Sequence, residues 1–361
     1  KEYPVQDFCI VSGFVVDFIQ SFFFRIFGVN WNSYIIHSSL FNLLMTLLSY
    51  HFFISLKISH FASFIYAICF ATLAYTVSGT PFVDHHATFF LLTGTFLIFR
   101  ALQKNDLNYL WPLIVFVYFL SFLSKQVPVT YAVILQGSLI LILIIKEKSF
   151  NIIWLILFST LVLIFSFLIF LFFLKIDFSL FLTQYIYYPR SIGLERFFSL
   201  DKSFISFFNE YKFIIIPIIF TLYLKIRKKN LYFRELINYL IILSFGVSLL
   251  YHQTLTRNQI YIYFLVPVFF SLLHSEIILK KNNLKKIFSN IIILSVILIT
   301  LKYHFRYNEN RKFHDLTSLK IENSIDAKNL NSSFKQLKWV NPLFEGLPQD
   351  ELKLLQKGQK I

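Results

Sequence analysis

An acidic residue and two histidines stand side by side in the stretch PFVDHHATFF, residues 81–90, between two strongly apolar runs. A carboxylate can accept a proton or bind a cation, and an imidazole can do either near neutral pH. Charged groups beside a membrane core are costly, so they tend to be paired or functional. Asp84, His85 and His86 are therefore the first candidates for chemistry in this chain.

Each of these residues also has a simpler structural role. Asp84 could cap a helix that starts at His85 or His86, which would not exclude catalysis. The histidines could be ordinary interface residues. Neighbouring residues on a helix point about 100° apart, so the two imidazoles fit poorly around one metal ion. Asp84 with one histidine, His85 first, is the easier set for a divalent metal cofactor.

Other polar residues recur where apolar runs meet. Lys125 and Gln126 lie between two runs that nearly touch, and His252 and Arg257 follow a later run. Asp7 precedes the first run. Lys125 could merely extend its ammonium group from a helix end to water, and Arg257 could anchor to lipid headgroups. We expect these residues to contact substrate, with Asp7 a further candidate for acid–base catalysis.

The segment 175–211 is long and aromatic, and it contains the run YIYYPR, which ends at Arg190. Such segments often carry function. The ring of Tyr188 suits a sugar face and the guanidinium of Arg190 suits a phosphate. The alternative is a pair of interfacial helices without a substrate role, with Arg190 as a lipid anchor.

Composition predicts how these residues are held. The chain has 361 residues, of which 57% are hydrophobic, and Phe alone occurs 47 times. Apolar runs close to the length of about 20 residues that crosses a bilayer core recur along most of it. We predict an all-α, polytopic membrane protein of about ten spans. The expected spans are 32–54, 60–79, 87–103, 109–124, 127–145, 152–174, 212–226, 235–251, 259–279 and 287–303.

The net charge of +15 has a source other than nucleic-acid binding. Most loop lysines and arginines fall in alternate short connections, such as KIRKKN (225–230) and KKNNLKK (280–286). The positive-inside rule places those connections in the cytoplasm. The segments 1–31, 175–211 and 251–258 and the PFVDHH loop then share the outer face, so the candidate residues converge there.

The two ends of the chain differ from its centre. Residues 1–31 are amphipathic and predict an interfacial helix in an outer loop. Residues 304–361 are rich in Lys, Asn and Ser and predict the start of a small extracytoplasmic domain. We expect the sequence to be a fragment that lacks a first span, which would make about eleven. The cysteines, Cys9 and Cys69, predict no disulfide framework.

Four stretches together resemble the GT-C superfamily of membrane glycosyltransferases. YPVQDF (3–8) with IFG (26–28) is similar to the first outer loop of that family. VDHHATFFLLTGTFLIFRALQKN (83–105) is similar to its next outer loop and span. FLSFLSKQVPVTYAVI (119–134) and TRNQIYIYFLVPVFF (256–270) resemble a Ser/Thr-Lys turn and a late outer loop. The resemblance covers residues 1–303. It rests on the order of the four stretches and on their expected topology rather than on any single motif.

The resemblance implies an enzyme that moves a sugar from a polyprenyl-phosphate donor to an acceptor outside the membrane, in the manner of protein mannosyltransferases and aminoarabinose lipid A transferases. It implies the bilayer and the lipid-linked sugar as partners, an acceptor of unknown kind, and a bacterial inner membrane as the location. Those families usually carry an acidic pair in the first outer loop. No such pair is visible here, so we expect it upstream of Lys1.

Within that mechanism a carboxylate would take the proton of the acceptor hydroxyl, and cations would stabilise the leaving phosphate. Three other functions remain open. One is a polysaccharide polymerase or ligase that uses lipid-diphosphate glycans. Another is a transporter or flippase, which the scarcity of charge inside the apolar runs disfavours. The third is a non-catalytic membrane scaffold.

Overall fold

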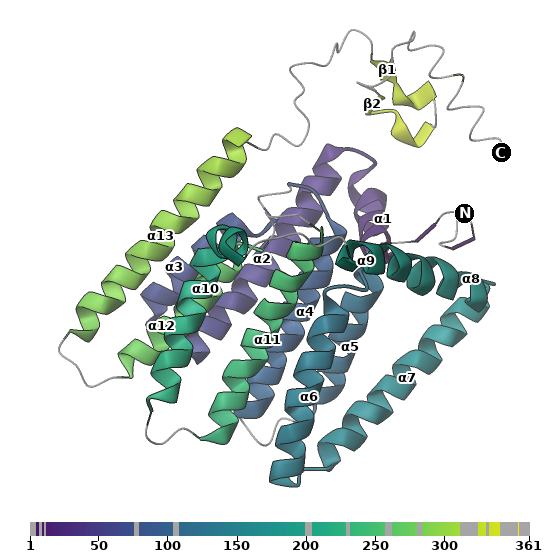
Figure 1. The fold of residues 1–361 in the computed structure, drawn as a ribbon. Helices are drawn as coiled ribbons and strands as arrows, with labels where there is room; N and C mark the ends of the chain where they lie inside the picture. Colours follow the sequence, from purple (N-terminus) through teal and green to yellow (C-terminus); the bar gives the residue numbers. More distant parts are fainter. Residues whose placement is uncertain are drawn as a thin grey trace.

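The chain is mostly helical throughout the part that the structure, a computed structural model, describes, as the composition predicted (Figure 1). The described residues are 5–6, 9–10, 12–75, 79–103, 108–198, 204–228, 232–256, 262–279, 284–310, 324–329, 332–339 and 353.

The helices, in chain order, are α1 (Val15–Phe27), α2 (Trp31–Ser55), α3 (His60–Leu73), α4 (Val83–Gln103), α5 (Leu110–Ser124), α6 (Val129–Glu147), α7 (Asn151–Phe173), α8 (Phe178–Leu182), the π-helical turn η2 (Thr183–Tyr187), α9 (Tyr188–Phe198), α10 (Phe204–Ile226), α11 (Phe233–Thr256), α12 (Leu265–Ile278) and α13 (Lys285–Asn310).

Every apolar segment expected to span a membrane overlaps one of these helices, but α3 and α12, with 14 residues each, are shorter than the expected spans 60–79 and 259–279. Six helices, α2, α6, α7, α10, α11 and α13, are long and apolar enough to cross a bilayer. Helices α3, α5 and α12 are apolar but shorter. Helix α4 is long enough, but the polar residues at both of its ends lower its mean hydropathy. The structure thus supports a helical membrane protein.

Of the segment 175–211, the described residues 178–198 and 204–211 are helical as well. They form α8, η2 and α9, and then the first turns of α10, which begins at Phe204 rather than near residue 212. The stretch FISFFNEY mixes apolar rings with Ser, Asn and Glu, so its hydropathy is too low to reveal the helix. At the other boundary, α13 continues to Asn310, beyond the predicted edge at residue 303.

Two short strands lie further along the chain. Strand β1 (Ile325–Asp326) pairs antiparallel with β2 (Lys338–Trp339). The 3₁₀ helices η5 (Ala327–Asn329) and η6 (Ser332–Phe334) lie between them. This small unit belongs to the region in which we expected a separate domain.

Most of the long helices run up and down in one bundle (Figure 1). At one end lie the start of α4 and the ends of α5 and α11, with α1, α8 and α9 across it. We call this the Asp84 end. At the opposite end lie the ends of α2, α4, α10 and α12 and the start of α11, which we call the Lys225 end. Helix α7 leans away from the bundle, and only 6% of its most apolar window is buried.

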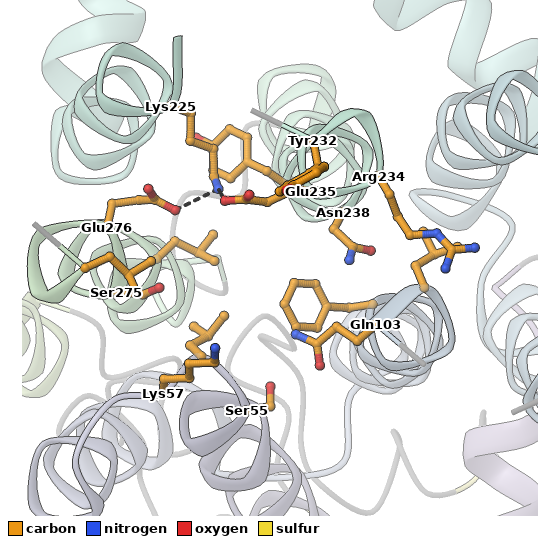
Figure 2. A pocket seen from close by; sticks show the side chains of 16 residues that line it. Ser55, Lys57, Gln103, Lys225, Tyr232, Arg234, Glu235, Asn238, Ser275 and Glu276 are labelled. Carbon is orange, nitrogen blue, oxygen red and sulfur yellow. Dashed lines mark hydrogen bonds and ion pairs between the residues drawn. The ribbon is translucent and has the colours of Figure 1, made fainter. Parts of the chain in front are cut away.

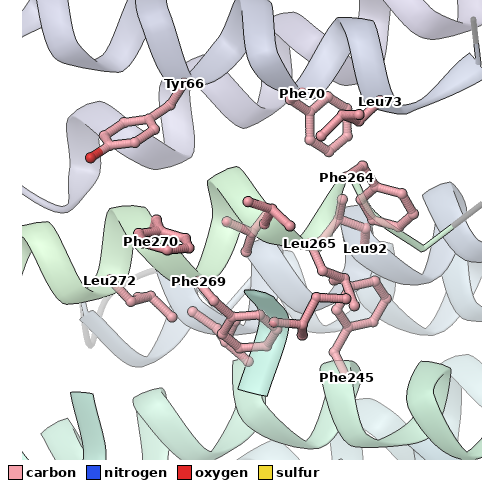
Figure 3. Close-up of a cluster of buried hydrophobic side chains, with 14 of the residues drawn as sticks. Tyr66, Phe70, Leu73, Leu92, Phe245, Phe264, Leu265, Phe269, Phe270 and Leu272 are labelled. Atoms are coloured by element: carbon pink, nitrogen blue, oxygen red, sulfur yellow. The ribbon is translucent and has the colours of Figure 1, made fainter. Parts of the chain in front are cut away.

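Aromatic and aliphatic side chains fill the centre of the bundle. Phe70 of α3, Phe89 of α4 and Phe264 beside α12 form a set of ring contacts with centroids 5.2–5.9 Å apart. Figure 3 shows the same core extended by Phe245 of α11 and Phe269 of α12. These fully buried rings hold α3, α4, α11 and α12 together between the two ends of the bundle.

Gly94 of α4 is packed directly against the side chain of Tyr118 on α5. A Cβ atom placed there would lie 1.9 Å from Cε1 of the Tyr118 ring. That ring has little freedom to move away, because the Tyr118 hydroxyl donates a hydrogen bond to Gln136 of α6. Gly94 therefore sets the distance between two helices that meet at the Asp84 end.

We expect Gly94→Ala to lower the thermal stability of the purified protein, by about 1–3 kcal/mol as is typical of overpacked cores. Gly137→Ala in α6 is the matched control, since a Cβ there would have no neighbour within 4 Å. Thermal unfolding in detergent measures both. Equal unfolding temperatures for the two variants would contradict the close contact between α4 and α5.

Candidate functional site

Three of the candidate residues meet in a buried charged cluster at the Asp84 end. The Oδ1 atom of Asp84 accepts a hydrogen bond from Nζ of Lys125 at 2.6 Å and lies 3.1 Å from Nε2 of His252. Asp84 and His252 are almost fully buried, and the Lys125 side chain is 20% exposed. Positive charge and hydrogen-bond donors close to a carboxylate stabilise its ionised form.

The cluster is positioned by three helix ends. Asp84 is in the first turn of α4, where the helix dipole favours negative charge. Lys125 follows the last residue of α5, where the dipole favours positive charge. His252 is in the last turns of α11. Because α4 already begins at Val83, Asp84 is a residue of the helix rather than the cap that the sequence left open.

The two adjacent histidines both contact Tyr75, but only His86 is hydrogen-bonded to a second histidine. The His85 ring stacks on Tyr75, with the centroids 4.7 Å apart. Nε2 of His86 lies 3.0 Å from Nε2 of His37, and its Nδ1 contacts the Tyr75 hydroxyl. Among the described residues, no group of three or more His, Cys, Asp or Glu side chains is placed to hold a metal ion.

His86 belongs to a buried chain of hydrogen bonds that the sequence did not reveal. Nδ1 of His37 lies 2.8 Å from Oε1 of Gln20, so in this arrangement the imidazole donates to the amide oxygen. Neutral His37 then accepts at Nε2 from Nε2–H of His86, and His86 accepts at Nδ1 from the Tyr75 hydroxyl. All donors point the same way, from Tyr75 toward α1.

Two more buried polar side chains lie next to the cluster in sequence. Gln253 follows His252, and Thr88 is one turn beyond Asp84 on α4. Within the described part of the chain, neither the Gln253 amide nor the Thr88 hydroxyl has a hydrogen-bond partner. A buried polar group left unpaired costs about 1–3 kcal/mol. Unpaired polar groups on the same helix ends as an ion pair are compatible with a site that binds a polar ligand.

The remaining candidates take different places. Nε2 of Gln126 donates to the backbone oxygen of Tyr185 at 2.7 Å, which ties the turn after α5 to η2. Tyr188 and Arg190 are exposed on α9 and do not join the cluster. The arginine of α9 that interacts electrostatically with His252 is instead Arg196. Asp7 and Arg257 lie outside the described residues.

The sequence offered a signal for some of the missed residues. Gln20 and His37 are polar residues inside otherwise apolar stretches, and Gln253 directly follows a candidate. Their partners come from distant helices, however, so only the fold shows that they pair with one another or lie beside the cluster.

We expect truncation of one partner of the Asp84–Lys125 pair to destabilise the fold more than truncation of both. Lys125→Ala leaves a buried carboxylate with His252 alone, and breaking buried pairs costs about 3–5 kcal/mol, toward the lower value here because Lys125 is partly exposed. The double variant Asp84→Ala/Lys125→Ala removes both charges. Thermal unfolding of the full cycle measures the coupling. Lys148→Ala, at an exposed position after α6, is the control, and strictly additive effects would exclude a coupled pair.

Comparisons of the chain with protein-family models, with curated proteins and with solved structures find no match.

Proposed function

We propose that this chain is an integral membrane glycosyltransferase of the GT-C type, which moves a sugar from a polyprenyl-phosphate donor to an acceptor. The observation that carries the proposal is the convergence of Asp84, Lys125 and His252, from three helices, into one buried cluster. Transfer of a sugar from a phosphate uses a carboxylate and a cation, and the imidazole of His252 helps to hold the carboxylate ionised.

The expected topology supports the same function. With all ten apolar helices as spans, the Lys/Arg-rich connections fall at the Lys225 end, which the positive-inside rule places in the cytoplasm. The Asp84 end then faces the outside, the periplasm if the membrane is a bacterial inner membrane. Lipid-linked sugars presented on that side would meet the cluster where the helices leave the bilayer.

The geometry favours distinct roles within the cluster. Asp84 is held ionised by Lys125 and His252, so it is a weak proton acceptor and is better suited to stabilise positive charge that develops on the sugar. Lys125 uses one of three ammonium donors on Asp84 and is partly exposed, so it can also face the leaving phosphate. The base that takes the acceptor proton would be Asp7.

Replacing the charge of Asp84 tests the proposal most directly. We expect Asp84→Asn to reduce transfer of radiolabelled sugar from polyprenyl phosphate to cell-envelope acceptors by at least about 100-fold, the contribution expected of a group that stabilises charge in the transition state. Asp326→Asn, at an exposed carboxylate on β1, should retain activity. The assay uses the full-length protein in membranes, with abundance matched. Undiminished transfer by a folded Asp84→Asn variant would refute the role of Asp84.

The role of Lys125 has its own kinetic signature. If its ammonium group stabilises the donor phosphate, Lys125→Gln should raise the KM for the lipid-linked donor several-fold and leave the KM for the acceptor nearly unchanged. Initial rates with each substrate varied in turn separate the two constants. Equal changes in both would count against a phosphate contact and favour a purely structural ion pair.

A second candidate, a proton-coupled transporter, is favoured by one specific observation. The chain Tyr75–His86–His37–Gln20 is a continuous path of hydrogen bonds through a buried region, and such paths can relay protons. The transfer assay separates the two functions. A transporter would move substrate across vesicle membranes in a pH-dependent manner without forming a new glycosidic bond.

A further inference from the structure

A second polar cavity lies at the Lys225 end of the bundle, far along the helices from Asp84. Its volume is about 360 Å³, within the range of roughly 300–1,000 Å³ usual for small-ligand sites. Figure 2 shows side chains from α2, α4, α10, α11 and α12 around this space. Lys225, Glu235 and Glu276 form one side, and Lys57, Ser55 and Gln103 the other.

The first side is a closed network of ion pairs. Nζ of Lys225 lies 2.7 Å from Glu276 and 3.3 Å from Glu235, and Nζ of Lys228 lies 2.7 Å from Glu235. Arg234 pairs with Glu147 at 2.6 Å. The carboxylate of Glu235 raises the pKa of Lys228 above its ordinary value by accepting its hydrogen bond. In this network each carboxylate already has a cationic partner.

Lys57 is the excess positive charge of the cavity. It lies exposed just after α2, and no described carboxylate is within ion-pair distance of its ammonium group. Asn238, on α11, is a second feature that a ligand could satisfy. Its side-chain oxygen is buried and has no hydrogen-bond donor among the described residues. The cavity therefore offers one uncompensated cation and a buried acceptor that needs a donor.

A neighbouring cavity of about 410 Å³ shares Ser55, Phe99 and Gln103 with the first. From this shared wall it extends between α2 and α4 along the apolar side chains of Leu48, Phe52 and Phe96, and His51 and Arg100 also line it. Leu48 lies two helical turns from Ser55 toward the middle of α2. The first compartment thus opens beside a second one with a partly apolar wall, at a level where spans of this length would leave the bilayer.

We propose that the two cavities together bind one anionic phospholipid. Its singly charged phosphodiester pairs with Lys57, its hydroxylated headgroup donates to Asn238 and to the carboxylates of Glu235 or Glu276, and an acyl chain lies between α2 and α4. Basic pockets between spanning helices are typical sites for acidic headgroups. This site is separate from the Asp84 cluster and does not depend on the transferase proposal.

The test uses the full-length protein in nanodiscs that contain phosphatidylcholine with a minority of phosphatidylglycerol. Native mass spectrometry of the released protein then reports which lipid is retained. We expect wild type to retain phosphatidylglycerol in preference to phosphatidylcholine. Lys57→Gln should reduce that preference about fivefold, the effect of one basic residue near a headgroup. Lys148→Gln, at another exposed position on the same end, should leave the preference unchanged.

A second variant and a soluble probe complete the test. Asn238→Leu should also lower retention, and circular dichroism verifies that the variant is folded. Glycerol phosphate should neither displace the lipid nor raise the unfolding temperature. Equal retention of both lipids would overturn the proposal, as would equal losses in Lys57→Gln and Lys148→Gln. Protection by glycerol phosphate alone would also overturn it and assign the cavity to a soluble organic phosphate.

Discussion

Asp84 can stay ionised inside the bundle because Lys125 and His252 reach it from two other helices. A charge that leaves water needs a partner of opposite sign and good hydrogen-bond geometry. The contacts of 2.6 Å and 3.1 Å to a single carboxylate oxygen meet that need. They also bind the start of α4 to the ends of α5 and α11, so the charge requirement constrains the register of three helices. The close approach of α4 to α5 at Gly94 works in the same direction.

Helix α11 connects the two charged ends of the molecule. It carries Glu235 in its first turn and His252 in its last turns, and 61% of its most apolar window is buried. By contrast, α7 is the most apolar of the candidate spans and has the least buried surface. Helices that carry buried charges therefore lie inside the bundle, where partners are available. Helix α7 carries no charged residue, so it can face lipid without a partner for a charge.

Much of the architecture could be predicted because hydropathy is a local property. Each expected apolar segment overlaps a helix, and Asp84, Lys125 and His252 were candidates before the fold was known. Pairing is not local, and it accounts for what was missed. Glu276 is an acid within an expected span, yet its partner Lys225 lies at the end of a different helix. His37 likewise has no sequence neighbour that points to His86. Arg190 was predicted from its place in the aromatic run YIYYPR, whereas the electrostatic interaction of Arg196 with His252 depends on how α9 lies against α11.

The two charged clusters are better explained by ligand binding than by a contribution to stability. Replacing a buried ion pair by apolar residues of similar volume is often neutral or stabilising. Large apolar residues are common in this chain, which has 47 phenylalanines. Apolar side chains would thus fill the same space at a lower energetic cost than the two clusters, which place Lys225 between two glutamates and Asp84 between Lys125 and His252. At the Lys225 end, the buried side-chain oxygen of Asn238 lines the same cavity as the charged residues and has no partner among the described residues. At the Asp84 end, the buried amide of Gln253, which follows His252 on α11, also has no partner among the described residues. Recognition of a polar ligand requires charge together with unpaired hydrogen-bonding groups, and each end of the bundle contains both.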